Sequence, residues 1–136
     1  MLFLAISGWL ARYLTTDNLE REEDVALIRA EARGDAAAII GRLENCRASP
    51  LCVATARQNA ADPRLRRSGA VKILSLTSAT ANSPGGATGK TRVAWTVIGH
   101  TPVVQCVAVR RTGSALTGVD VTLLSLSRPI PNEADC

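Results

Sequence analysis

The segment PGGATGKT (84–91) contains the residue types of a phosphate-binding loop, in which backbone amides and a lysine hold the phosphates of a nucleotide. That pattern requires a glycine five positions before Gly89, and Pro84 stands there instead. The loop must also open a helix, whose N-terminal amides face the phosphate, whereas the residues from Thr91 onward alternate as in a strand. We therefore interpret the segment as a glycine-rich hairpin loop and expect no nucleotide or other cofactor.

His100 is the only histidine, the residue type that most often serves as a general base near neutral pH. It occurs in the short GHT turn between two expected strands, and no carboxylate lies nearby in the sequence to orient it. The chain also contains no G-x-S-x-G motif for a nucleophilic serine. These observations predict no catalytic site, and we expect His100 to be a turn residue.

The four cysteines, Cys46, Cys52, Cys106 and Cys136, form the clearest chemical pattern. Zinc sites usually contain C-x-x-C pairs or nearby histidines, and this spacing has neither, so we expect no metal. An even number of cysteines in a short chain instead predicts two disulfides. Of the three possible pairings we favour Cys46–Cys52 with Cys106–Cys136; the alternative is four reduced thiols. Two disulfides would place the domain outside the cytoplasm.

The formal net charge is only mildly positive, at +4. The clearest clusters are Arg64, Arg66 and Arg67, followed by Lys72, and the pair Arg110 and Arg111. No aromatic residue is interleaved with either cluster, unlike in proteins that bind single-stranded nucleic acid. We expect no nucleic-acid partner and interpret these charges as a solvated face or as a surface facing anionic lipid headgroups.

Residues 1–16 are expected to form a hydrophobic N-terminal helix or anchor. The stretch is shorter than the roughly 20 apolar residues that a bilayer crossing requires. Either it is the end of a transmembrane helix whose first turns are missing, or it packs against a membrane or a neighbouring subunit; a third alternative places it in the domain core. The residues expected to make the membrane or subunit contact are Leu2, Phe3, Leu4, Ile6, Trp9, Leu10 and Tyr13.

Residues 17–136 are expected to form a single α+β domain, whose helices occupy about 17–61. Asp17 and Glu20 have the spacing of a capping box, which predicts that a helix begins there and ends at Arg33. The acidic residues of its first turns, from Glu20 to Asp24, are expected to form a solvated collar near the membrane.

Two shorter helices are expected next. Asp35 is a suitable N-cap for a helix over residues 36–44. Ser49 as N-cap and Pro50 at the first helical position begin the third, which ends before Pro63 because a residue that precedes proline avoids helical geometry.

From Gly69 onward the sequence alternates with the period of two that is typical of strands. Four strands are expected over residues 70–79, 91–98, 102–111 and 118–127. No helix-length segment separates them, so they predict an antiparallel meander over about 69–128, followed by a disulfide-tied tail over 129–136. The expected fold class is therefore α+β, with N-terminal helices packed on one face of a four-stranded antiparallel meander sheet.

This order of elements resembles the cystatin-like and NTF2-like α+β folds, and small bacterial membrane-anchored proteins that carry such a domain outside the membrane. The resemblance runs from LEREEDVALIRAEARGDAAAII through TRVAWTVIG and PVVQCVAVRR to VTLLSLS. NTF2-like proteins place polar side chains in a cavity between sheet and helix. The strand residues that correspond are Thr96, Gln105, Asp120 and Thr122, and we expect Asp120 to be exposed.

The same order also resembles type IV pilin-like subunits, which combine a hydrophobic N-terminal helix with a four-stranded sheet and a C-terminal disulfide. The chain differs from them at Arg12, which interrupts the apolar run, and in having no glutamate near its start. This resemblance implies subunits of an extracellular filament, and a helix continuous from about Leu2 to Arg33.

We therefore expect a non-catalytic interaction or scaffold domain on the extracytoplasmic side of the cell envelope, anchored at its N-terminus. Its partners would be the membrane or identical subunits through the N-terminal helix, together with an envelope protein. The alternatives are a pilin-like structural subunit and an NTF2-like small-molecule-binding domain, which would require a closed pocket with at least two convergent polar side chains.

Overall fold

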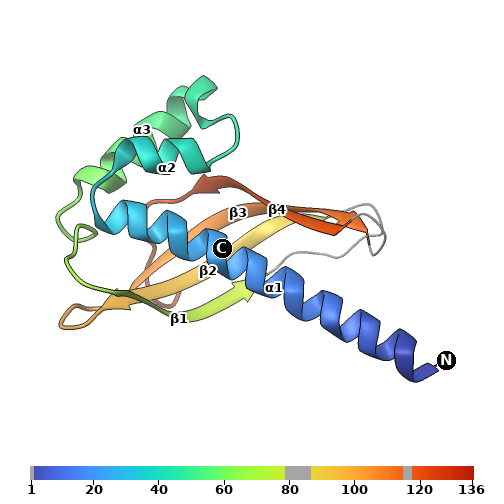
Figure 1. The fold of residues 1–136 in the computed structure, drawn as a ribbon. Helices are drawn as coiled ribbons and strands as arrows, with labels where there is room; N and C mark the ends of the chain where they lie inside the picture. Colours follow the sequence, from blue (N-terminus) through green and yellow to red (C-terminus); the bar gives the residue numbers. More distant parts are fainter. Residues whose placement is uncertain (1, 79–86, 115–117) are drawn as a thin grey trace.

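The computed structural model describes residues 2–78, 87–114 and 118–136, without the side chains of residues 9, 11–17, 114 and 119. In this part of the chain the helical segments precede the strands (Figure 1). The helical segments are α1 (Leu2–Ala32), α2 (Ala36–Arg42), the 3-10 turn η1 (Cys46–Ala48) and α3 (Pro50–Ala61). The strands are β1 (Val71–Ser78), β2 (Ala87–Val97), β3 (Val103–Ser114) and β4 (Gly118–Leu126).

The strands form one antiparallel sheet in the order β1-β2-β3-β4, which is the expected meander. Alternation brings the apolar side chains of each strand to one face, where Val93, Trp95, Val107 and Leu123 are fully or almost fully buried. The register shifts between Ile73 and Ser75 and again after Ala108. The expected α+β class is thus confirmed.

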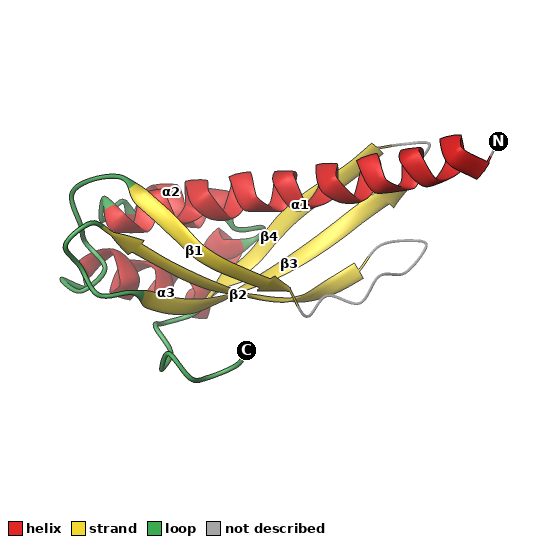
Figure 2. Cartoon of the chain, turned by 90° about the horizontal axis from the view of Figure 1, so that it is seen from below, coloured by secondary structure: helices red, strands yellow, loops and turns green. Residues whose placement is uncertain are grey.

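Helix α1 crosses this apolar face of the sheet, and α2 and α3 lie at one end (Figure 1). Leu27, Ile28 and Ala30 of α1 have no exposed surface and belong to the core that the sheet and the shorter helices share. Seen from below, the first turns of α1 extend past the sheet, and the C-terminal segment lies on the opposite side of the sheet (Figure 2).

The expected start of the first helix at residue 17 is wrong, because α1 is continuous from Leu2 to Ala32. Asp17 lies inside the helix, and Glu20 does not complete a capping box. Its carboxylate instead accepts a hydrogen bond from Thr91 Oγ1 and forms an ion pair with Arg111. Contacts with the sheet therefore prevail over a local signal that would cap an isolated helix.

The caps expected for the shorter helices are present. Asp35 Oδ1 accepts a hydrogen bond from the Ala38 amide at 3.0 Å, and Ser49 Oγ accepts one from the Cys52 amide at 3.3 Å. Gly34, at the end of α1, has a φ of +70°, a conformation that glycine adopts without strain. Together these residues reverse the chain so that α2 and α3 return to cover the core.

The glycine-rich segment 84–91 lies partly outside the described residues, but its second half differs from the expected loop. Ala87 to Lys90 belong to β2, which therefore starts earlier than residue 91. Lys90 is exposed in this strand, and no helix begins there. The backbone is thus unlike the strand–loop–helix geometry of a phosphate-binding loop.

Candidate functional site

The first turns of α1 expose apolar side chains to solvent, and we call residues 2–10 the projecting helix. The exposed fractions are 79% for Leu2, 81% for Phe3 and 74% for Leu4, and Ile6 and Leu10 are more than half exposed. At roughly 100° per residue, these five side chains lie on several sides of the helix. Exposed apolar side chains on several sides of a helix are typical of a surface that packs against an apolar environment, and the described residues of this chain leave these five uncovered.

Two other expected contact residues, Trp9 and Tyr13, belong to α1, but their side chains lie outside the described residues. Within the described part of the chain, no helix has the length and apolar content that crossing a bilayer demands.

The second half of α1 joins the projecting helix to the domain core. Glu20, Asp24, Leu27 and Glu31 are spaced by four, three and four residues, so they lie on one side of the helix, and all four are buried. The expected solvated collar is therefore only partly correct, because Glu22 is exposed but Glu20 and Asp24 are not. Their spacing relative to Leu27 is the sequence signal that would have revealed this.

Asp24 has no exposed surface, and neither of its carboxylate oxygens has a hydrogen-bond partner among the described residues. Burial, with a smaller contribution from the charge of Glu23, raises the pKa of Asp24 to about 7. The carboxyl group is therefore largely protonated below neutral pH, which lowers the cost of burying it.

A second buried acid, Glu31, connects α1 to Gln105 in the middle of the sheet. Gln105 Nε2 donates to both oxygens of Glu31, at 2.9 and 3.1 Å, and Gln105 Oε1 accepts a hydrogen bond from Trp95 Nε1 at 2.8 Å. Burial raises the pKa of Glu31 to about 8, although the hydrogen bond from Gln105 and the charge of Arg128 lower it. All three side chains have no exposed surface, so no substrate reaches this acid in the folded protein.

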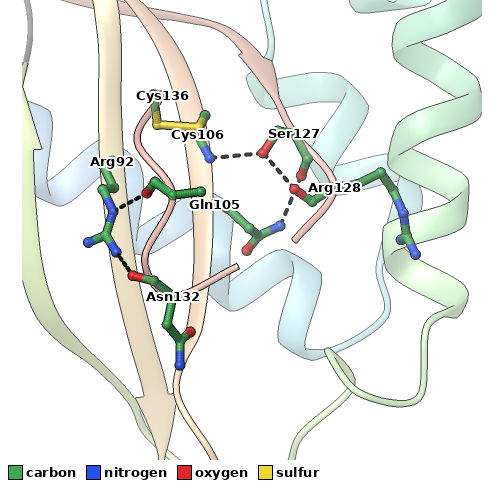
Figure 3. The surroundings of a disulfide bond; sticks show 8 residues. Arg92, Gln105, Cys106, Ser127, Arg128, Asn132 and Cys136 are labelled. Carbon is green, nitrogen blue, oxygen red and sulfur yellow. Dashed lines mark hydrogen bonds between the residues drawn. A yellow bond between two sulfur atoms is a disulfide. The ribbon is translucent and has the colours of Figure 1, made fainter. Parts of the chain in front are cut away.

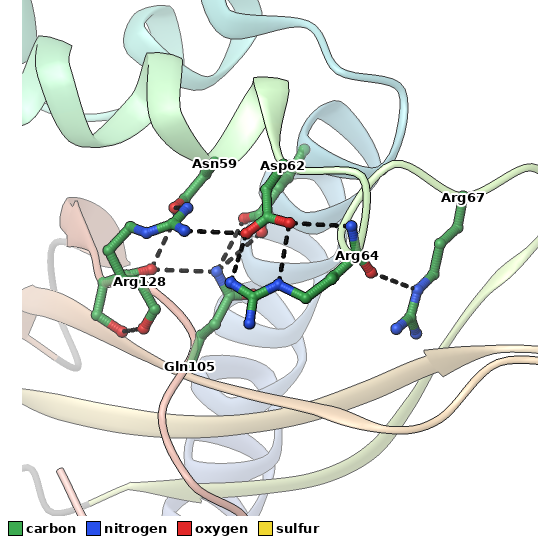
Figure 4. Close-up of polar contacts among 8 residues, drawn as sticks. Asn59, Asp62, Arg64, Arg67, Gln105 and Arg128 are labelled. Carbon is green, nitrogen blue, oxygen red and sulfur yellow. Dashed lines mark hydrogen bonds and ion pairs between the residues drawn. The ribbon is translucent and has the colours of Figure 1, made fainter.

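Close to Glu31, at the end of α3, Asp62 forms ion pairs with two arginines (Figure 4). Its carboxylate accepts hydrogen bonds from Arg64 Nη2 at 2.7 Å and from Arg128 Nη2 at 2.9 Å. Arg128 Nη1 also donates a hydrogen bond to Asn59 Oδ1 at 2.7 Å. The hydrogen bonds from Arg64, with a further one from Arg128, hold the pKa of Asp62 well below its usual range. The group joins α3 to the segment that follows β4.

The structure contains two disulfides with the favoured pairing. The turn disulfide, Cys46–Cys52, joins η1 to α3 with a Cα–Cα distance of 5.3 Å. The tail disulfide, Cys106–Cys136, joins β3 to the last residue with a Cα–Cα distance of 5.7 Å. Both distances are usual for disulfides, and paired cysteines are typical of proteins in oxidising compartments.

The tail disulfide is supported by polar contacts on the face of the sheet opposite α1 (Figure 3). Arg92 donates to the carbonyl oxygens of Ala134 and Asn132, and Ser127 Oγ accepts a hydrogen bond from the Cys106 amide. An isolated bridge pairs Ile130 with Val104. The tail is thus held at several points.

The polar residues expected to line an NTF2-like cavity do not converge. Gln105 lies inside the core against Glu31, Asp120 is exposed as expected, and Thr96 and Thr122 are half-buried. His100 is exposed in the turn between β2 and β3. Among the described residues, no group of three His, Cys, Asp or Glu side chains could hold a metal ion.

The expectation of a solvated face for the 64–67 cluster is wrong for Arg67. This residue is buried, lies 5.2 Å above the centre of the Trp95 ring, and donates to two backbone carbonyls. Arg64 and Arg66 are exposed, as expected. Arg67 was missed because the sequence does not reveal that this loop crosses the edge of the core.

Comparison of the chain with protein-family models, with curated proteins and with solved structures found no match.

Proposed function

We propose that this chain is a non-catalytic interaction or scaffold domain on the extracytoplasmic side of the cell envelope, attached through its projecting helix. The observation that carries the proposal is the set of exposed apolar side chains on a helix that continues, without a break, into the domain core. Burying a large apolar side chain contributes about 1.5–3 kcal/mol, so these five would provide substantial attachment energy.

The two disulfides support the extracytoplasmic location, because reducing compartments keep thiols unpaired. The non-catalytic part of the proposal rests on the buried acids. Glu31 and Asp24, whose pKa values are raised, have no exposed surface and are enclosed by core residues.

The test is co-flotation of the oxidised full chain with vesicles that contain phosphatidylglycerol, compared with the variant Leu4→Gln/Ile6→Gln/Leu10→Gln. A matched control changes three exposed apolar residues elsewhere, Leu51, Leu74 and Ile98, to glutamine. We expect the wild type and the control to float and the helix variant to remain in the dense fraction. Equal flotation of all three proteins would contradict attachment through the projecting helix.

A second candidate is a pilin-like structural subunit. The observation that favours it is the continuity of α1 from Leu2 to Ala32, which this function requires. Sedimentation velocity without lipid separates the two candidates, because subunit packing would produce large assemblies of the wild type and the control but not of the helix variant. A wild-type monomer that floats with vesicles would exclude the second candidate.

A further inference from the structure

A cavity of about 470 Å³ lies where α1 ends and the chain approaches β1. One wall is formed by Arg29 and Ala32 at the end of α1 and by Arg33, which follows it, and the other is the segment 66–71. Most of these residues are exposed, so the cavity is open to solvent. Its volume falls in the range of small-molecule sites.

The lining of this cavity is strongly basic. It contains four arginines, Arg29, Arg33, Arg66 and Arg67, and no acidic residue. Within the described residues none of the four forms an ion pair with a carboxylate, in contrast to Arg64 and Arg128. Basic residues in the last turns of a helix are common because they offset the helix dipole, but that effect accounts only for Arg29 and Arg33.

The charge of Arg67 is held in place without a carboxylate partner among the residues that the structure describes. The residue is 9% exposed, and its side chain donates hydrogen bonds to the carbonyl oxygens of Arg64 at 2.8 Å and Thr101 at 2.7 Å. Its own amide donates to the Ala32 carbonyl at 2.9 Å, which fixes the loop against the end of α1. Buried charges are normally paired with an opposite charge, and Arg67 is one of the residues that line the cavity.

Arg66 is positioned by the end of α1. A Cβ added to Gly34 would lie 2.6 Å from Arg66 Nε, so the arginine side chain passes directly over this glycine. Glycine at position 34 therefore makes room for Arg66 beside Arg33. The basic groups of the two walls are thus brought together by the fold, and an anion between them would relieve their mutual repulsion.

We propose that this cavity binds an anion that carries phosphate groups. Guanidinium groups suit phosphate because they stay protonated and donate two parallel hydrogen bonds to its oxygens. The cavity exceeds the size of one phosphate, and Ala32, Ala70 and Val71 supply apolar walls for an organic part.

The source of the phosphate follows from the position of the cavity on α1. Arg29 lies 19 residues after Leu10, roughly 28 Å along the helix axis at 1.5 Å per residue. If the projecting helix enters a membrane end-on, this distance exceeds the Debye length at physiological salt. A soluble phosphate compound fits this placement better than a lipid headgroup, and the test below separates the two sources.

The experiment is isothermal titration of the oxidised full chain with pyrophosphate at constant ionic strength. The variant Arg33→Gln/Arg66→Gln removes two exposed cavity arginines, and the matched control Arg21→Gln/Arg57→Gln removes two exposed arginines that do not line the cavity. We expect the wild type and the control to bind with similar Kd values. The cavity variant should bind at least about tenfold more weakly, because it loses charge-assisted hydrogen bonds.

Vesicles containing phosphatidylglycerol form a second arm, in which all three proteins also carry Leu4→Gln/Ile6→Gln/Leu10→Gln so that the projecting helix does not itself hold them on the vesicles. If only the cavity variant loses vesicle binding, and none of the proteins binds pyrophosphate, the result would support the phosphate site with a lipid headgroup as the source of the phosphate. Equal behaviour of all three proteins toward both probes, including no binding, would overturn the proposal. Equal weakening of both variants would also overturn it, since net charge alone would then explain the binding.

Discussion

Replacing Glu31 by glutamine tests whether a buried acid makes folding depend on pH. Glu31 has no exposed surface, and its oxygens accept hydrogen bonds from Gln105. Burial raises its pKa from 4.5 to about 8. Glutamine keeps the shape and a carbonyl acceptor for Gln105 but does not ionise.

The sign follows from proton binding. Because the folded-state pKa is the higher one, the folded chain binds more protons between the two values, so stability decreases as the pH rises through this window. The contribution is complete below about pH 4.5 and lost above about pH 8. At 1.36 kcal/mol per pKa unit, the loss amounts to about 4–5 kcal/mol, as an order of magnitude.

The assay is urea unfolding of the oxidised protein at pH 5 to 9, followed by far-ultraviolet circular dichroism. The free energy of unfolding of Glu31→Gln, minus that of the wild type, should increase by about 4 kcal/mol between pH 5 and pH 8.5. Asp24, whose pKa is raised to about 7, adds to the pH dependence of both proteins and cancels in the difference. Glu22→Gln, a change at an exposed position of the same helix, is the control. A difference that stays constant across this range would refute the reasoning, because Glu31 would then ionise in the folded protein as it does in the unfolded chain.

Three further changes have defined outcomes. Asp62→Asn should lower the free energy of unfolding by about 2 kcal/mol at pH 7. Because the pKa of this carboxyl is held low in the folded protein, the difference in free energy of unfolding between wild type and variant should shrink as the pH falls below 4. Urea unfolding of both proteins from pH 7 to pH 3 measures this difference. Replacing both cysteines of the tail disulfide, which are 30 residues apart, should lower the free energy of unfolding by about 4 kcal/mol. Replacing both cysteines of the turn disulfide, which are 6 residues apart, should lower it by about 2 kcal/mol. Thermal unfolding compares the two, and equal losses would contradict the loop-length argument. Gly34→Ala should cost about 2 kcal/mol, because φ is +70° and the new Cβ would meet a neighbouring arginine; unchanged stability in urea would show that the loop adjusts freely.

The strands could be predicted from the sequence because their signal is local. Val93, Trp95 and Val97 alternate with more polar residues, and this period of two persists when the strands pair. The caps at Asp35 and Ser49 are local in the same way, since each side chain bonds to an amide three residues later.

The start of α1 and the partners of its buried acids could not be predicted in this way. Asp17 and Glu20 have capping-box spacing, yet the helix continues through them because Glu20 has partners on β2 and β3. Charged residues are assigned to solvent by default, and only the packing of α1 on the sheet places Glu31 beside Gln105. The arginine-lined cavity has the same origin, since residues 29–33 and 66–71 are separated in the sequence.

The tail disulfide has a mechanical consequence. A pulling force applied at residues 2 and 136 would enter the sheet directly at Cys106, because the covalent bond bypasses everything between the two cysteines. Strand β4 and the tail would then carry no tension along their backbone. At about 3.4 Å per residue, the stretched oxidised chain would be roughly 100 Å shorter than the reduced one from this loop of 30 residues alone.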